Sequence, residues 1–502
     1  MASDAVGSEL VSKVVGYKIT KGNFSNTTPN LPQRVAIFAE ANTANQSNLV
    51  NTGVEITTAQ QAGELYGFGS PVYTIFRILR PNSGSGIGGI PTIVYAQDAA
   101  AGSTAQVLEV TPTGVATANA VHTLVVSGRK GIDGSSYDMS ILKDDTTADI
   151  TAKISDAINN VLGCPLTAVN TDYETTATSK WTGLTAADIS ITVDTNDNDA
   201  GITYAVVETV TAAGTPSVQA ALDMFENDWV TLVVNSYGAV SSTMDTLEAF
   251  NGIPDPNSPT GRYSGIIMKP FVALTGSVLE DPSSLTDTRK DDVTISICPA
   301  PLSAGLPFEA AANVCLMEAR TAQDTPQLDI INRSYPDMPA PASIGAMATY
   351  VNRDSIVKKG CSTVELIDGK YSMADFVTTY HPVGETPPQF RYVRNLMLDF
   401  NVRFGYYLLE QINVVGHVIL NNGDSSSASK TVKPKQWKQI VDKYAVDLTD
   451  RALIADTSFM QDSIEVSISS TNPDRFETFF RYKRSGIARI ASTTAEAGFN
   501  FG

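Results

Sequence analysis

The stretch PPQFRYVRNLMLDFNVRFGYYLLEQI, from Pro387 to Ile412, decides how the last part of the chain folds. Its apolar residues recur at spacings of three and four, at Val393, Leu396, Met397, Phe400, Phe404, Tyr407, Leu408 and Ile412. Charged residues fall between them, which is typical of a long amphipathic helix with a wide apolar face. Pro387-Pro388 predicts the start of this helix, because a proline in the first turn loses no hydrogen bond.

After a serine-rich break at residues 424–429, the pattern changes to that of a strand. Ile464, Val466 and Ile468 alternate with polar residues, which predicts a half-buried strand and makes these three the candidate acceptor sheet for a strand from another chain. The chain closes with Gly486 to Ala491 and a small-residue tail that ends in Phe499-Asn500-Phe501-Gly502. An apolar end of this kind is an aggregation hazard unless it pairs with something.

Two interpretations of this C-terminal arm (485–502) are open. It is a strand for the sheet of another subunit, or it is the last strand of its own domain. Under the first interpretation, the arm residues that contact a neighbour are Ile487, Ile490, Phe499 and Phe501.

The first 32 residues form a second candidate arm. A short apolar run precedes the polar stretch Thr20-Lys21-Gly22, and residues 26–32 have the composition of a loop. The candidate strand-donor residues here are Val11, Val14, Tyr17 and Ile19. The alternative is an edge strand docked on its own domain.

Composition narrows the class of protein. With 502 residues, 42% of them hydrophobic and 18% charged, the chain predicts a folded protein of two to four domains. A net charge of −18 argues against a surface that grips nucleic-acid phosphates. The N-terminus has no signal-peptide pattern and no apolar run is long enough for a membrane span, so we expect folding in the cytosol and no membrane insertion.

Between the two arms, the sequence predicts an α/β body interrupted by a β-rich insert. Buried-strand runs at Arg34–Ala39, Thr92–Ala96, Trp229–Asn235 and Val293–Pro299 alternate with helical patterns, which predicts a mixed, mostly parallel sheet covered by helices. Gly261–Pro270 is expected to continue that alternation. Residues 105–216 are threonine-rich and strand-like, with one helix at 148–162, and predict a β-rich α+β domain inserted between body parts 33–104 and 217–386. Residues 387–484 then form the C-terminal assembly domain.

No catalytic or metal-binding pattern stands out. The three histidines and four cysteines form none of the spacings that bind zinc, and no nucleophile elbow is present, so we predict neither an enzyme nor a cofactor. The acidic run 194–199 lacks the glycine and final glutamate of a calcium loop. One basic stretch stands out in this acidic chain, namely Lys430, Lys433, Lys435, Lys438 and Lys443. It either faces an acidic partner or is a solvated helix face.

Taken in order, several motifs resemble the sheath subunit of contractile bacteriophage tails, in the version with a threonine-rich insert found in Mu-like phages. Residues 58–71, with the centre Gly67-Phe68-Gly69-Ser70, resemble the opening of that family. Residues 127–157, 165–168, 180–183 and 188–189 are similar to its insert. Residues 229–235, 261–265 and 273–276 resemble the following body, and the ending from Asn472-Pro473-Asp474 to Gly502 resembles its C-terminal arm.

This resemblance implies a structural protein of the virion, assembled in the host cytoplasm. Sheath subunits form hexameric rings stacked helically around a tail tube, add arm strands to neighbouring sheets, and contract on a signal from the baseplate to drive the tube through the host envelope for genome ejection. The implied partners are other copies of the chain, the tube protein, which the five lysines would face, and baseplate and terminator proteins. The alternative is a virion or cell-surface module whose insert binds a ligand.

Overall fold

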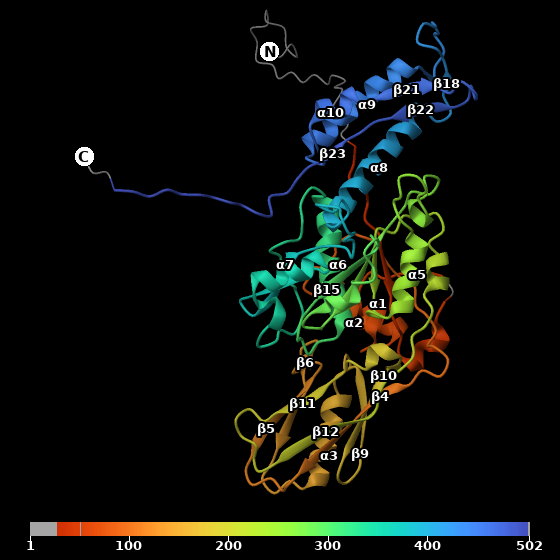
Figure 1. Ribbon diagram of the computed structural model, residues 1–502. Helices are drawn as coiled ribbons and strands as arrows, with labels where there is room; N and C mark the ends of the chain where they lie inside the picture. Colours follow the sequence, from red (N-terminus) through yellow and green to blue (C-terminus); the bar gives the residue numbers. More distant parts are fainter. Residues whose placement is uncertain (1–27, 51, 500–502) are drawn as a thin grey trace, which may run out of the picture.

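A computed structural model describes residues 28–50 and 52–499, and its centre is a six-stranded sheet in the order β15-β14-β13-β1-β3-β2 (Figure 1). β2 pairs antiparallel with β3, and the other neighbouring strands pair parallel. The predicted mixed, mostly parallel sheet is therefore confirmed. Its strands are β1 (Val35–Phe38), β2 (Val54–Glu55), β3 (Thr92–Val94), β13 (Leu232–Asn235), β14 (Val272–Ser277) and β15 (Ile295–Pro299).

Two helices lie between β1 and β3, on either side of Gly67-Phe68-Gly69-Ser70. The side chain of Thr58 accepts a hydrogen bond from Gln61 N and begins α1 (Ala59–Tyr66). Ser70 does the same for α2 (Pro71–Leu79), where it accepts from Tyr73 N. Gly67 turns the chain between them at φ +94°, where an added Cβ would collide with the side chain of Asn42.

The remaining helices and the small sheet of the body come from residues 217–386. They are α4 (Gln219–Asp223), α5 (Ser241–Asn251), α6 (Pro307–Asp324) and α7 (Tyr350–Lys358), with the hairpin β16 (Thr363–Ile367) and β17 (Lys370–Asp375). Single 3-10 turns lie at Thr43–Asn48, Gly261–Tyr263, Pro282–Leu285 and Gly345–Ala348.

The expectation for Gly261–Pro270 is wrong, because this segment holds only a 3-10 turn and no strand or longer helix. The Arg262 guanidinium, 5% exposed, donates to the carbonyls of Glu226, Asp228 and Lys269. These bonds hold the segment as a folded loop, and the next strand begins only at Val272.

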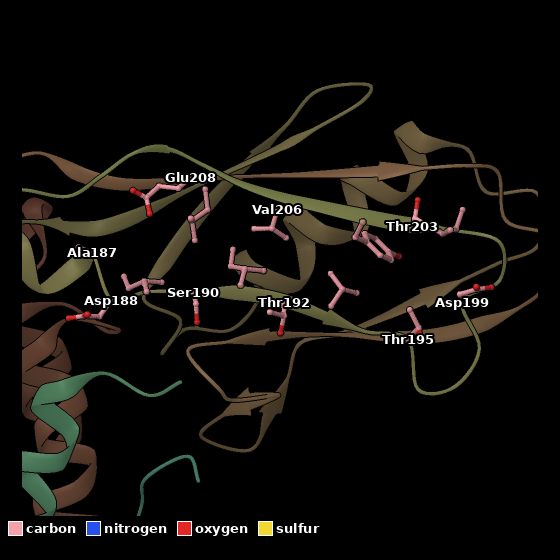
Figure 2. Close-up of a pocket in the computed structure, with 15 residues that line it drawn as sticks. Ala187, Asp188, Ser190, Thr192, Thr195, Asp199, Thr203, Val206 and Glu208 are labelled. Atoms are coloured by element: carbon pink, nitrogen blue, oxygen red, sulfur yellow. The ribbon is translucent and has the colours of Figure 1, made fainter. Parts of the chain in front are cut away.

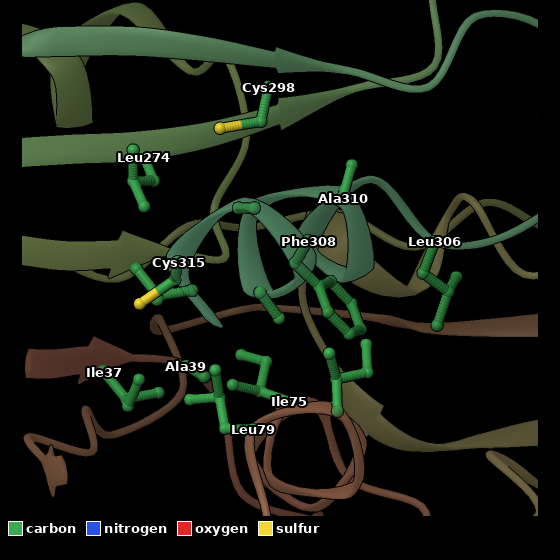
Figure 3. Close-up of a cluster of buried hydrophobic side chains, with 14 of the residues drawn as sticks. Ile37, Ala39, Ile75, Leu79, Leu274, Cys298, Leu306, Phe308, Ala310 and Cys315 are labelled. Atoms are coloured by element: carbon green, nitrogen blue, oxygen red, sulfur yellow. The ribbon is translucent and has the colours of Figure 1, made fainter. Parts of the chain in front are cut away.

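The core of the body lies on both faces of the sheet. On one face α6 packs between the sheet and α2, so that Ile37, Ile75 and Phe308 meet (Figure 3). On the other face Phe38, which follows Ile37 and therefore points the opposite way, contacts the ring of Phe225 at 5.9 Å between centroids. All four side chains of β1 are buried, as expected for a central parallel strand.

Residues 105–210, between β3 and β13, form two larger sheets and a third, two-stranded sheet of β6 and β7. One of the larger sheets has four strands in the order β12-β4-β10-β9, and the other has three in the order β11-β5-β8. The elements are β4 (Ala105–Thr113), β5 (Ala120–Val126), β6 (Gly131–Ile132), β7 (Ser135–Ser136), β8 (Asp138–Ile141), α3 (Thr147–Asn159), β9 (Leu166–Asn170), β10 (Thr175–Thr182), a 3-10 turn at Leu184–Ala186, β11 (Ile191–Asp194) and β12 (Thr203–Val210). The buried face of β10 includes Thr175 and Ser179, so apolar periodicity alone does not identify this strand.

The chain ends in a smaller C-terminal unit, defined here as residues 393–485. It comprises α8 (Val393–Asn413), β18 (Val418–Ile419), β19 (Thr431–Val432), α9 (Pro434–Asp450), β20 (Ile454–Ala455), α10 (Thr457–Asp462), β21 (Glu465–Ile468), β22 (Phe476–Phe479) and β23 (Lys483–Arg484). Across the described ranges, no helix is both long and apolar enough to cross a bilayer.

The long helix is confirmed, but its predicted start at Pro387-Pro388 is wrong. Thr378 N donates to Arg391 O (2.7 Å), and Val377 forms an antiparallel bridge with Tyr392. These contacts hold residues 391–392 in an extended conformation, so α8 begins at Val393.

Candidate functional site: the junction that holds both chain ends

Helix α8 joins the C-terminal unit to the body because it contributes side chains to two hydrophobic cores. Val393, Leu396 and Phe400 belong to the core of the body. Leu398 and Val402 belong to a second core, which also contains Trp437, Val441, Tyr444, Ala445, Leu448, Leu453, Ile454, Met460 and Ile464. The C-terminal unit therefore has a core of its own and is attached through one rigid helix. The outer end of the predicted apolar face is exposed, with Ile412 67% accessible.

The turn that ends α9 anchors the described start of the chain. Arg451 donates from Nη1 to Thr28 Oγ1 (2.7 Å) and from Nη2 to Asn30 Oδ1 (2.6 Å). The Asp447 carboxylate accepts from the Thr28 hydroxyl at 2.6 Å. Three residues after Thr28, Leu31 N donates to Asn401 Oδ1 of α8 at 2.8 Å. The first described residues, 28–31, therefore lie against the C-terminal unit.

The same turn anchors the outgoing chain. Ser485 N donates to Leu453 O (3.2 Å), and its hydroxyl donates to Ala452 O (2.5 Å). Arg394 of α8 donates to the carbonyl and the hydroxyl of Ser485, at 2.7 and 2.8 Å. Residues 451–453 therefore contact both Thr28, the first described residue, and Ser485, at the start of the C-terminal arm, and we call this turn the junction.

A buried ion pair fixes the first residues of the C-terminal tail. The Arg489 guanidinium pairs with Asp329, whose side chain is 0% exposed, and it lies 3.8 Å from the ring centroid of Tyr392. Beyond this residue the tail leaves the fold (Figure 1), and Ile490 is 84% exposed. No strand is assigned between residues 486 and 499. The tail is thus held up to Arg489 and extends from there.

The hairpin β21–β22 carries the residues predicted as an acceptor sheet. Its register runs from Glu465 opposite Phe479 to Ile468 opposite Phe476. Ile464 is buried and Val466 and Ile468 are half-buried, on the side of the hairpin that faces the second core. Within the described residues this sheet has two strands, so each strand has one edge without a partner strand. Any strand from elsewhere would therefore bind along the backbone and not on these side chains.

The rest of this hairpin segment is tied to α8. The ring of Phe480 lies 5.1 Å from that of Tyr406, and the Tyr482 hydroxyl donates to Asp399 at 2.8 Å. Arg484 forms an ion pair with the same carboxylate, also at close range (2.6 Å). Burial and the neighbouring Asp399 carboxylate raise the pKa of Tyr482 well above its usual value.

The five lysines of the basic stretch do not form one uniform face. Lys438 donates from Nζ to the carbonyls of Ile464 (2.7 Å) and Gln461 (3.4 Å), so it holds the end of α10 against α9. Lys433 donates to the carbonyl of Asp424. The other three, Lys430, Lys435 and Lys443, are exposed.

The predicted arm residues are described only in part. Val11, Val14, Tyr17, Ile19 and Phe501 lie outside the described residues. Ile487 is half-buried, and Ile490 and Phe499 are exposed. Sequence reasoning missed the polar contacts that hold the arms, at Asp447, Arg451, Arg394 and Asp329. Their partners lie as far as 423 positions away in the chain, so no local spacing signals them.

The described ranges contain no group of three or more histidine, cysteine, aspartate or glutamate side chains that could hold a metal ion. All four cysteines are free and buried. Burial raises the pKa of the Cys361 thiol to about 12, which disfavours the reactive thiolate.

Comparisons with known proteins give a likeness of fold. No protein-family model matches the chain, and no curated protein matches it. Among solved structures, a sheath tail protein from Desulfitobacterium hafniense is similar at 12% identity and a TM-score of 0.47, covering 93% of this chain and 100% of that one. The anti-feeding prophage baseplate is similar at 12% identity and a TM-score of 0.48, covering 97% of this chain and 100% of the matched chain.

Proposed function

We propose that this protein is the structural subunit of a contractile tail sheath, which polymerises around an inner tail tube by exchanging the strands of its two arms. The observation that carries the proposal is the junction at residues 451–453, which contacts both Thr28, the first described residue, and Ser485, where the C-terminal arm begins. A subunit that donates strands from the same C-terminal unit that carries its own open-edged hairpin can both give and accept strands in one connected mesh.

The exposed tail supports the role of the C-terminal arm as a donor. Ile490 is 84% exposed, and residues 486–498 pair with no strand in the described part of the chain. An exposed apolar segment with unpaired backbone groups gains hydrogen bonds and buried area when it joins a sheet edge. The hairpin β21–β22 offers such an edge on each side.

Contraction would use the separation of the two cores. Because α8 alone contributes to both, a lattice of C-terminal units linked by arms would stay connected while the bodies change their packing around it. A head-to-tail contact of this kind does not close on itself and so generates a helical array. In this account, the tube lies on the side of the exposed lysines Lys430, Lys435 and Lys443, and the baseplate and terminator proteins contact the two ends of the sheath.

Removing the arms tests the proposal. We expect the wild-type chain to form tubes at high concentration in negative-stain micrographs. Deletion of residues 490–502, or of residues 1–20, leaves a folded monomer in sedimentation velocity that forms no tubes. The point change Ile490→Asp, which keeps the length of the tail, weakens assembly in the same direction.

A matched deletion controls for nonspecific damage. Removing Ser425–Ser427, in an exposed loop of the same C-terminal unit, should leave tube formation unchanged. Long tubes formed by both arm truncations would refute the assignment of the arms, and a wild-type chain that stays monomeric at every concentration would refute the proposed function.

A further inference from the structure

A groove of about 840 Å³ lies between the two larger sheets of residues 105–210, far from the C-terminal unit (Figures 1 and 2). Consecutive residues from 187 to 193 line one side of it, and alternate residues of β12, Tyr204, Val206 and Glu208, line the other. Consecutive residues mark the edge of a strand, and alternate residues mark one face of a strand. The groove therefore runs along the edge of β11 and across the inner face of β12.

The edge of β11 presents unpaired backbone groups to this groove. Leu124 N of β5 donates to Tyr137 O on the β8 side (3.0 Å), and Ser127 N donates to Ser190 O on the β11 side (2.8 Å). Since bonding directions alternate along a strand, Thr192 points its N–H and C=O toward β5, and Ile191 and Val193 point theirs into the groove. β11 is the last strand of its sheet in the described part of the chain.

The two sheets differ in their number of strands, and the position that a fourth strand would fill in the smaller sheet lies beside β11. The first sheet has four strands and the second has three, so the inner face of β12 has no strand opposite it. Val206 shows the consequence. It pairs with Val110, which is 0% exposed on the same face, yet Val206 itself is 37% exposed. A strand added beside β11 would bond to Ile191 and Val193 and cover Val206.

The charged residues that line the groove favour a basic segment as its occupant. Asp188, Asp199 and Glu208 line it, and none of its lining residues, all of them in the described part, is lysine, arginine or histidine. Glu208 is oriented by a hydrogen bond from Gln106 Nε2 at 2.9 Å. Desolvating a strand that carries acidic groups would be unfavourable here, whereas lysine or arginine would find carboxylates along the rim.

We propose that the groove binds an extended basic segment of a partner protein, which adds a fourth strand beside β11. The segment is apolar at alternate positions, so that every second side chain packs on Leu108 and Val206. Lysine or arginine at positions between them faces the acidic rim. This site is independent of the C-terminal junction and would operate whether or not the chain forms a sheath.

A labelled peptide tests this site directly. The probe is fluorescein-KVTVKVT-amide, titrated with the full-length monomeric protein and followed by fluorescence anisotropy. We expect saturable binding that weakens as salt rises. A peptide with glutamate in place of both lysines, and one with N-methyl groups along the edge that faces β11, should each bind about tenfold more weakly or worse.

Two neighbouring valines of β12 give a matched pair of variants. Val206→Lys places a charge on the inner face and should abolish binding, while Val207→Lys, on the outer face where the valine is 54% exposed, should leave it unchanged. Val206→Thr, a milder change checked by circular dichroism, should weaken binding with the fold intact.

Three results would overturn the proposal: no binding of the probe by the wild type, equal loss in both lysine variants, or full binding of the N-methylated peptide. A wild-type dimer in sedimentation velocity that Val206→Lys dissociates would also overturn it, because the occupant would then be a second copy of the chain.

Discussion

The body and the C-terminal unit are built in opposite ways. In the body, β1 has neighbours on both edges and is buried on both faces. In the C-terminal unit, β21 has one partner strand and only alternate side chains are half-buried. If the chain forms a sheath as proposed, we expect its contacts with other copies to lie at the open hairpin of the C-terminal unit, while the body moves as one piece.

One substitution in the smaller core tests whether the two cores unfold independently. Trp437 is 1% exposed, and its Nε1–H donates to Thr478 Oγ1 at 3.0 Å. Trp437→Ala should cost about 3–5 kcal/mol, because it leaves a large cavity in a small core. We expect hydrogen exchange to rise sharply in residues 434–480 and to stay unchanged in β1 and β13.

The matched change in the body is Phe76→Ala, at a residue that is 0% exposed. It should reduce protection in the body sheet first. If Trp437→Ala removes protection from β1 as well, the two cores unfold as one unit and the comparison fails.

The buried ion pair of the tail gives the next largest effect. Arg489→Ala leaves the Asp329 carboxylate buried without its partner, which should cost about 3 kcal/mol. The midpoint of thermal unfolding should fall, and residues 485–499 should exchange faster.

Two variants sharpen this result. Arg475→Ala removes an exposed pair with Glu477 and should cost less than about 1 kcal/mol. The double change Asp329→Ala with Arg489→Ala should recover part of the lost stability, because no buried charge is then unpaired. A double variant as unstable as Arg489→Ala would show that the tail is held by something else.

Much of this comparison could be predicted from the sequence, because periodicity reports burial. Residues 35–39 are all apolar, and β1 within them is buried on both faces. Ile464, Val466 and Ile468 alternate with polar residues and lie at a half-buried hairpin. The helix that links the two cores was predicted from spacings of three and four.

The features that could not be predicted from the sequence are those that depend on contacts between residues far apart in the chain. Pro387-Pro388 signals a helix start locally, but the bridge between Val377 and Tyr392 holds the chain extended there. Strand β10 buries Thr175 and Ser179, so its pattern does not register as apolar. The contacts of Arg451 and Arg489 join residues far apart in the chain, and no local pattern encodes them.

Stability of the body should depend on pH through a carboxyl group beside β1. Glu40 is 1% exposed, accepts from Thr185 Oγ1 at 2.8 Å, and burial raises its pKa to about 7. A folded-state pKa above the unfolded value means that the folded protein binds the proton more tightly. Unfolding free energy should therefore rise as pH falls from above 7 toward 4.5.

The variant Glu40→Gln isolates this group. At pH 8 it should raise the unfolding free energy by about 2 kcal/mol, since no charge then has to be buried, and near pH 5 the gain should vanish. Chemical denaturation at both pH values measures it. An equal gain at both values would assign the effect to packing and not to ionisation.

The smallest expected changes in stability are those of substitutions at two lysines of α9, Lys438 and Lys443. Comparing them tests whether the basic stretch contacts a partner. Lys438 holds the carbonyls of Ile464 and Gln461, so Lys438→Met should cost about 1 kcal/mol through lost hydrogen bonds. Lys443 is exposed, and Lys443→Glu should change monomer stability by less than about 0.5 kcal/mol. If exposed lysines face an acidic tube, Lys443→Glu should nevertheless block loading of the protein onto tubes in a co-sedimentation assay while Lys438→Met does not. Normal loading by Lys443→Glu would leave this lysine as a solvated side chain, and the open hairpin and the two arms would then be the assembly surface of the C-terminal unit.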